Sequence, residues 1–368
     1  MKNRIDLNLK EKSYGIYIQN GLLADAGNFV KLVTNPKKIL ILSVPFVFKR
    51  YGRVLCSSLR KTGAKVYSLL ISDGEIRKNE ITLFSILKKM AELGFQRDCC
   101  LITLGGGVVG DIGGMAASIY MRGIDFIQCP TTLLAQVDAS VGGKTAIDFK
   151  GIKNLIGTFY QPKLVLIDPS VLKTLNERQI RTGLAEVIKY GIICDEKLFE
   201  NIEKNLDFVL SKEPNILLPI IKKSCEIKAR IVSEDEKEKG KRAWLNYGHT
   251  LGHALESNFG YQLLTHGEAI AYGMWYASLL SLKVKLCTES VARRQFELLK
   301  RSGLFRGLPE FKPRVIYEKM LLDKKAKNGK IQFVLTRKIG LVTIPKNVPA
   351  SIILSVLTQF QAETRELD

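Results

Sequence analysis

The sequence lacks the features that mark a membrane-spanning or secreted protein. No run of 18 or more apolar residues occurs, and the opening MKNRIDLNLKEKSYG has no apolar core of the kind a signal peptide carries. The seven cysteines are odd in number and show no CxxC spacing, which argues against a disulfide framework and a cysteine zinc site. With 46% hydrophobic and 25% charged residues, the chain is predicted to be a globular cytoplasmic protein.

The formal net charge of +20 raises the question of an anionic partner. The basic residues are spread along the chain, and no nucleic-acid-binding signature accompanies them. We therefore expect neither a nucleic acid nor a membrane as partner. A small phosphorylated substrate and a diffuse basicity without a specific role both stay open.

The first 170 residues alternate apolar runs with helical patterns. Amphipathic stretches such as EITLFSILKKMAELG between the apolar runs predict a parallel sheet with helices on both faces. Residues 1–168 are thus predicted to be an α/β amino-terminal domain with a Rossmann-like parallel sheet, of the type that binds nucleotides. The runs typical of buried strands are KKILILS (37–43), KVYSLLI (65–71), CCLITL (99–104), DFIQCP (125–130) and KLVLID (163–168).

From about residue 169 the pattern changes to helical periodicity, as in NERQIRTGLAEVIKYGIIC and GEAIAYGMWYASLLSLKVKLC. Residues 169–368 are predicted to be a mainly α-helical carboxy-terminal domain. Near the end, KIQFVLTRKIGLVTI predicts a β-hairpin. The charged run SEDEKEKGKR is interpreted as a solvated connection between helices.

A glycine cluster, LGGGVVGDIGG, follows the apolar run that ends at residue 104. Glycines between a strand and a helix allow a tight turn and a close approach of backbone amides to a pyrophosphate. Gly105, Gly107 and Gly110 fit the Rossmann spacing loosely, and a glycine-rich packing turn is the alternative. The later VGGKT is not a P-loop, because Asp138 stands where that motif needs its first glycine, so Lys144 is available to pair with a substrate anion.

Histidine is scarce, and its three copies, His249, His253 and His266, fall within 18 positions. A catalytic zinc takes three protein ligands, often two histidines and a carboxylate, and keeps one position open. No HExxH occurs, which excludes the metalloprotease motif. The spacing leaves open which two histidines bind metal, and the carboxylate could be that of Glu186, Glu256 or Glu268.

Several motifs together resemble the 3-dehydroquinate synthase family of the shikimate pathway over nearly the whole chain. They are DGEIRK, GGGVVGDIGG, YMRGIDFIQCPTTLLAQVDASVGGKTAID, KNLIGTFYQP, GLAEVIKYGI, LNYGHTLGHALE, HGEAIAYGM and DKKAKNGKIQFVL. The resemblance implies that residues 1–168 form an NAD-binding domain and residues 169–368 a helical domain that binds metal and substrate, with Glu186, His249 and His266 as the zinc ligands and Co²⁺ as a substitute metal. It also leaves His253 beside the metal as a substrate or proton-relay residue.

The same resemblance implies which residues bind the cofactor and the substrate. Those implied for NAD are Asp73, Glu75, Lys78, Gly105, Gly106, Gly107, Val108, Asp111, Thr131, Thr132, Asp138, Lys144 and Lys153. Those implied for the substrate are Lys144, Lys153, Asn154, Lys189, Lys228, Arg242, Asn246 and Lys324. Arg122 matches an arginine that reaches the substrate phosphate of a neighbouring subunit, which implies a homodimer.

Two positions depart from the family pattern. Ile152 stands where the family usually has glycine, and LSVPF lacks the acidic or amide residue often found near the adenosine ribose.

The reaction that the resemblance implies converts 3-deoxy-D-arabino-heptulosonate 7-phosphate into 3-dehydroquinate. It proceeds by transient oxidation with NAD, elimination of phosphate, re-reduction, and an intramolecular aldol closure. The alternatives are a metal- and NAD-dependent polyol dehydrogenase and a sugar-phosphate cyclase that makes another ring. A non-enzymatic polyanion-binding protein would explain the charge but neither the histidines nor the glycine turn.

Overall fold

The computed structural model describes residues 4–260, 263–322 and 331–367, and its internal contacts divide the chain into two compact units. The first consists of Met1–Asn176 and Pro214–Glu236, and the second of Glu177–Glu213 and Lys237–Asp368. This division differs from the single boundary predicted at 168/169, because helix α8 (Pro214–Glu234) belongs to the first unit, where it packs against strand β1 (Arg4–Leu7) and the π-helix η6 (Ala135–Ala139). Helical periodicity shows that a face is apolar, but not which core that face will cover. The functions assigned to the two domains stay predictions.

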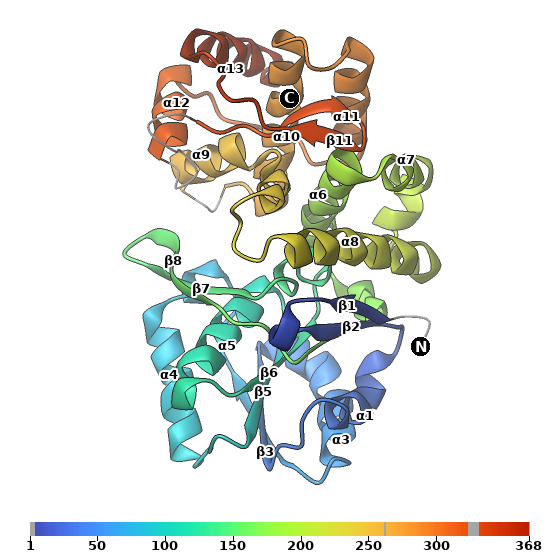
Figure 1. The fold of residues 1–368 in the computed structure, drawn as a ribbon, viewed down its shortest axis with the longest axis vertical. Coiled ribbons are helices and arrows are strands. Elements are labelled where there is room, and N and C mark those ends of the chain that lie inside the picture. Colours follow the sequence, from blue (N-terminus) through green and yellow to red (C-terminus); the bar gives the residue numbers. More distant parts are fainter. Residues whose placement is uncertain (1–3, 261–262, 323–330, 368) are drawn as a thin grey trace. The chain divides into compact units, whose positions relative to one another are not determined.

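A seven-stranded sheet forms the centre of the first unit, in the order β1-β2-β9-β6-β5-β3-β4. Figure 1 labels β1, β2, β3, β5 and β6 of this sheet. The six strands β2, β9, β6, β5, β3 and β4 run parallel to one another, and β1 pairs antiparallel with β2. All five predicted strands are confirmed, as β3 (Lys38–Ser43), β4 (Lys65–Leu70), β5 (Cys99–Gly105), β6 (Asp125–Pro130) and β9 (Leu164–Ile167). The strands that the sequence patterns did not predict are β1 (Arg4–Leu7), β2 (Tyr14–Ile18), β7 (Lys144–Phe149) and β8 (Ile152–Phe159).

Helices cover both faces of this sheet, as predicted. Alternate strand residues point to opposite faces, so Ile102 joins the core under α1 and α3, whereas its neighbour Leu101 joins the core under α4 and α5. The two cores explain why a central strand such as β5 is apolar along most of its length rather than at every second residue. The helices are α1 (Ala26–Lys31), α2 (Pro45–Val47), α3 (Arg53–Arg60), α4 (Glu80–Glu92) and α5 (Gly107–Ile119).

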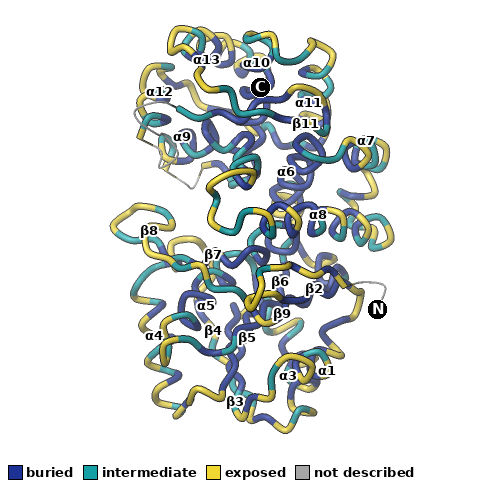
Figure 2. Tube along the Cα trace, in the orientation of Figure 1, coloured by how far each residue is buried: buried dark blue, intermediate teal, exposed yellow. Residues whose placement is uncertain are grey.

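Strands β7 and β8 form a separate antiparallel hairpin in the first unit. Figure 2 shows much of β8 as exposed. Phe149 pairs with Ile152, and the two residues between them, Lys150 and Gly151, both have positive φ, as a tight hairpin turn requires. Ile152 itself is not at positive φ, so its replacement of the usual glycine places no strain on the hairpin.

The second unit is mainly helical, as predicted. The predicted hairpin is confirmed in its β10 (Leu335–Lys338) and β11 (Leu341–Thr343), which pair antiparallel. Its helices are α6 (Glu177–Cys194), α7 (Glu196–Leu210), α9 (His249–Phe259), α10 (His266–Lys283), α11 (Glu289–Arg301), α12 (Pro313–Leu322) and α13 (Ala350–Thr364).

The structure bears on two features of the composition, the lack of long apolar runs and the seven cysteines. Among the described residues, no helix combines the length and the apolarity that a bilayer crossing demands. All seven cysteines are free, and burial raises the pKa of Cys129 and Cys225 to about 12, which keeps these thiols protonated and unreactive.

Candidate functional site

The glycine turn lies where the sequence predicts it, between strand β5 and helix α5. Gly106 precedes the first turn of α5, and a Cβ atom at this position would lie 3.1 Å from Cγ2 of Thr132. A side chain at Gly106 would therefore fill the space in front of the helix amino terminus. The backbone N–H of Thr131 donates to the carbonyl of Gly105 (2.9 Å), which fixes the end of β6 beside the turn. This arrangement can hold a pyrophosphate against the first amides of α5.

The residues predicted to bind NAD lie around this turn to different degrees. Thr131 is buried, and its hydroxyl makes no hydrogen bond within the described part of the chain. Gly107, Val108 and Thr132 are partly exposed, and the Thr132 hydroxyl accepts from the N–H of Ala135 (3.1 Å). Asp73 and Glu75 are exposed in the segment before α4.

Lys78 lies inside the first unit, where it joins two other predicted site residues. Its Nζ donates to Oδ2 of Asp111 and to Oδ1 of Asn154, both at 2.5 Å, and its side chain is 5% exposed. Burial lowers the pKa of Lys78, but the charges of Asp111 and Glu75 outweigh it and raise that pKa above its usual value. Lys78 is therefore a charged link between the start of α4, helix α5 and strand β8.

A second buried link joins Lys228 of α8 to Asp138. The Lys228 Nζ donates to both the carbonyl and Oδ1 of Asp138, each at 2.6 Å. The link holds two predicted residues next to each other, one from the NAD set and one from the substrate set. The substrate set also includes Lys144, which is exposed at the start of β7, and Lys153, which is partly exposed on β8.

Arg122 lies in a tight turn after α5. Its φ is 66°, and both neighbours, Met121 at 52° and Gly123 at 113°, also have positive φ. Positive φ is uncommon for residues other than glycine, so the turn is held in a costly conformation. It leaves Arg122 exposed on the surface of the first unit.

In the second unit, Glu186 of α6 and the first residues of α9 and α10, His249 and His266, form a cluster. Their ligand atoms all lie within 4.8 Å of one another. Oε1 of Glu186 lies 3.6 Å from Nε2 of His249 and 3.5 Å from Nε2 of His266, and Glu186 is fully buried. One carboxylate and two imidazoles that converge in this way are the donor set of a catalytic zinc site.

The geometry separates these three residues from the other candidates. Glu268 faces away, paired with Arg178 through two bonds of 2.8 Å, and Oε1 of Glu256 lies 3.7 Å from Nδ1 of His266, on the ring's other nitrogen. His253 is one turn further along α9, with its ring centroid 5.3 Å from that of His249 and 6.4 Å from that of His266. The third histidine therefore lies beside the cluster rather than in it.

The imidazoles of His249 and His266 each make a further contact through Nδ1. The Nδ1 of His249 lies 3.1 Å from the carbonyl of Tyr247, whose buried hydroxyl donates to Gln295 (2.6 Å). This contact suits a proton on Nδ1 and leaves Nε2 to face Glu186. Burial lowers the pKa of His266, but contacts with Glu186 and Glu256 outweigh it and raise that pKa to about 10.

The remaining predicted residues of the second unit lie near this cluster in the chain. Lys189 is buried one turn after Glu186 and forms an ion pair with it, and Arg242 is also buried. The Asn246 amide donates to Oε1 of Glu238 at 2.6 Å. Glu238 was not predicted, because it lies in the charged run that was interpreted as a solvated connection. Lys324 falls outside the described residues.

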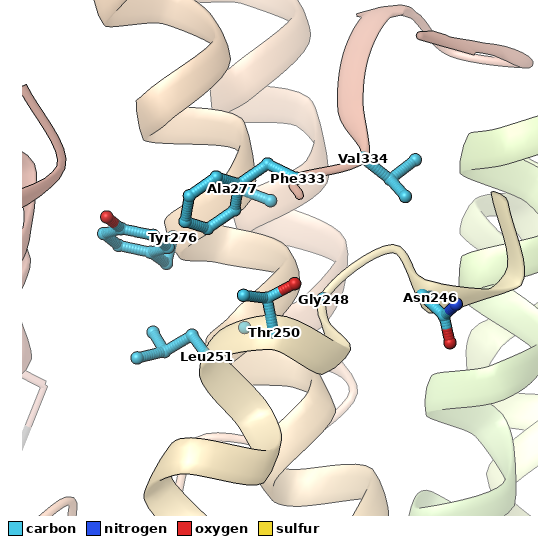
Figure 3. A pocket seen from close by; sticks show the side chains of 9 residues that line it. Asn246, Gly248, Thr250, Leu251, Tyr276, Ala277, Phe333 and Val334 are labelled. Carbon is cyan, nitrogen blue, oxygen red and sulfur yellow. The ribbon is translucent and has the colours of Figure 1, made fainter. Parts of the chain in front are cut away.

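A small cavity of about 10 Å³ lies between the start of α9, helix α10 and residues 333–334 (Figure 3). Thr250 and Leu251 of α9, Tyr276 and Ala277 of α10, and Phe333 are among the residues that line it. This volume is about that of one water molecule, so the cavity cannot admit a sugar phosphate.

The sequence was compared with protein-family models, with curated proteins and with solved structures. Residues 68–182 match a model described as 3-dehydroquinate synthase N-terminal, and residues 183–326 match one described as 3-dehydroquinate synthase C-terminal. A curated 3-dehydroquinate synthase from Rippkaea orientalis is 46% identical over 356 residues, which cover 96% of this chain and 97% of that protein.

Two solved structures resemble the chain along nearly its whole length. One is 2-epi-5-epi-valiolone synthase from Streptomyces hygroscopicus subsp. jinggangensis 5008 with NAD⁺ and Zn²⁺ bound, at 27% identity and a TM-score of 0.88, covering 97% of this chain and 99% of that one. The other is 2-deoxy-scyllo-inosose synthase in complex with carbaglucose-6-phosphate, NAD⁺ and Co²⁺, at 26% identity and a TM-score of 0.87, covering 97% and 100%.

Proposed function

The chain belongs to the 3-dehydroquinate synthase family, and from this premise we propose that it converts 3-deoxy-D-arabino-heptulosonate 7-phosphate into 3-dehydroquinate and phosphate. The observation that carries the proposal is the 46% identity with a synthase of that name over 96% of the chain. The Glu186–His249–His266 cluster supports the same reaction, because it lies inside the segment that the carboxy-terminal family model matches.

Two cofactors fit the residues present. Glu186, His249 and His266 would hold Zn²⁺, or Co²⁺ in its place, and the turn at Gly105, Gly106 and Gly107 would hold NAD. When bound, these groups supply a Lewis acid at the substrate's hydroxyl pair and a hydride acceptor that is regenerated in each turnover. Further residues proposed to bind NAD are Asp73, Glu75, Lys78, Val108, Asp111, Thr131, Thr132, Asp138, Lys144 and Lys153.

The proposed substrate carries a carboxylate and a phosphate, roughly three negative charges at neutral pH. Lysine and arginine side chains balance these charges and stabilise phosphate as it leaves. Asn246 and His253 guide the proton steps, since a neutral imidazole can relay protons near physiological pH. The residues proposed for the substrate are Lys144, Lys153, Asn154, Lys189, Lys228, Arg242, Asn246, Lys324 and, from a second subunit, Arg122.

Because Arg122 is assigned to the active site of a second subunit, the enzyme is proposed to be a homodimer. The exposed position of Arg122, in a turn of three residues with positive φ, supports a role outside its own subunit. We also place the reaction in the cytoplasm, where thiols stay reduced, and the seven free cysteines support this location.

The test is phosphate release from heptulosonate 7-phosphate in the presence of NAD and zinc, with and without a chelator, while absorbance at 340 nm is followed. We expect release that the chelator abolishes, with no accumulation of NADH. Sustained NADH formation without phosphate would identify a polyol dehydrogenase instead. Phosphate release with a ring product other than dehydroquinate would identify another sugar-phosphate cyclase.

A further inference from the structure

Two of the three proposed metal ligands lie on helices that are joined by an ion pair outside the cluster. Arg178 lies two turns before Glu186 on α6, and Glu268 lies two residues after His266 on α10. The guanidinium donates through Nε to Oε1 and through Nη2 to Oε2, both at 2.8 Å. A planar fork with two parallel bonds fixes orientation as well as distance.

The same carboxylate also determines where α10 begins. Oε2 of Glu268 accepts from the backbone N–H of Thr265 (2.8 Å), and the Thr265 hydroxyl accepts from the N–H of Glu268 (3.4 Å). These reciprocal bonds form a capping box, and His266 is the first residue after the cap. The position of the His266 ring thus depends on a cap that includes the partner of Arg178.

Helices α6 and α10 also approach each other closely in the region between the Arg178–Glu268 ion pair and the metal cluster. The hydroxyls of Thr182 and Thr265 are 2.9 Å apart, and Arg178 also donates to the carbonyl of Leu263 (2.9 Å). A Cβ atom at Gly267 would lie 2.4 Å from the carbonyl oxygen of Thr182, so only glycine fits there. The start of α10 is therefore held against the backbone of α6 one turn before Glu186.

We propose that Arg178 and Glu268 are positioning residues for the metal: they fasten the amino terminus of α10 to α6 and so keep His266 and Glu186 at ligand distance from each other. Neither residue would touch the metal or the substrate. The inference rests on the metal site of the proposed function and deepens it. Because Glu268 is 2% exposed, removing Arg178 would leave a buried carboxylate without its cation, and the cap would have to rearrange.

The second unit contains a matched control pair. Arg294 of α11 forms a similar fork with Glu203 of α7, with bonds of 3.0 Å from Nε to Oε1 and 2.5 Å from Nη2 to Oε2. The exposed fractions of the two arginine side chains are close, 42% for Arg178 and 36% for Arg294, whereas the Glu203 side chain is 22% exposed and that of Glu268 only 2%. Arg294 joins two helices that carry none of the proposed ligands.

The experiment compares Arg178→Ala, Arg178→Lys and Arg294→Ala with the unchanged full-length protein. Zinc affinity is measured by competition with a chromophoric chelator, and ligand geometry by the visible absorption spectrum of the Co²⁺-loaded protein. We expect Arg178→Ala to bind zinc at least roughly tenfold more weakly and to shift the Co²⁺ spectrum. Arg178→Lys keeps the charge but loses the fork, and should lie between Arg178→Ala and the unchanged protein.

Arg294→Ala should lower the melting temperature without changing zinc affinity or the Co²⁺ spectrum. Unchanged affinity and spectrum in both Arg178 variants, or equal losses in Arg178→Ala and Arg294→Ala, would overturn the proposal while leaving the synthase function intact. If the protein without any substitution bound no zinc, the proposed metal site itself would be wrong. The positioning role of Arg178 and Glu268 would then be wrong as well.

Discussion

His249 and His253 lie one helical turn apart on α9, and the structure gives them different neighbours. Nε2 of His249 faces the buried Glu186, whereas the ring of His253 lies at the edge of the cluster. The grouping of all three histidines could predict a metal site, but it could not show which two of them lie closest to Glu186. Spacing along a helix shows which residues share a face, not which of them a third element approaches.

This difference leads to a prediction for two single substitutions. His249→Ala should lose bound zinc and with it phosphate release, because a ligand is removed. His253→Ala should retain zinc while turnover falls, by roughly a hundredfold if the imidazole takes part in general acid–base catalysis. Zinc content by atomic absorption and phosphate release are measured on the same preparations. Equal zinc loss in both variants would contradict this division of roles.

The contact of Glu238 with Asn246 could not be predicted from the sequence. It lies in a run of charges, SEDEKEKGKR, and such runs are usually solvated. In the structure it accepts a hydrogen bond from Asn246, one of the predicted site residues. Nothing in the composition of the run distinguishes this glutamate from its neighbours, so only the folded chain reveals the contact.

At the scale of elements, burial accounts for most of the predicted strands but not for every success and failure, since β2 was missed although all five of its residues are buried. Four of the five predicted strands, β3, β5, β6 and β9, are buried almost throughout and appear in the sequence as apolar runs, whereas the edge strand β4 was predicted although none of its residues is buried. Hairpin β7–β8 was missed because it does not join the main sheet and leaves apolar side chains such as Ile152 and Phe159 partly exposed. Strand β1, with four residues, is too short for its alternation to stand out.

The contacts of Lys78 with Asp111 and Asn154 lead to a prediction about the stability of the first unit. Lys78→Met should destabilise the first unit by about 3 kcal/mol, because it leaves the Asp111 carboxylate without its cation in a largely buried position. The measurement is the shift of the urea unfolding midpoint. Lys37→Met is the control, since the Lys37–Asp98 pair is exposed and its loss should change little. Equal shifts in the two variants would show that the buried Lys78–Asp111 pair contributes no more to stability than the exposed Lys37–Asp98 pair.

At the scale of the whole molecule, the sequence predicted the order of a parallel α/β part and a helical part, but not the path of the chain between them. Residues 214–236 return to the first unit after α6 and α7 have begun the second. Local patterns identify α8 as a helix, whereas its assignment to a unit depends on packing against β1 and η6, far away in the sequence. Contacts of this kind are set by the tertiary fold.

The proposed homodimer predicts recovery of activity when two inactive chains are mixed. If Arg122 completes the active site of the other subunit, Arg122→Ala and Lys189→Ala should each be inactive as pure dimers. In a mixed dimer, the Arg122→Ala subunit keeps its own Lys189 and receives an intact Arg122 from its partner, so one of the two sites works. Random exchange makes half of all dimers mixed, and phosphate release should therefore recover to about a quarter of the unmutated level. Stable dimers without recovery after mixing would place Arg122 in its own subunit's site, and a monomer by light scattering would exclude the shared site altogether.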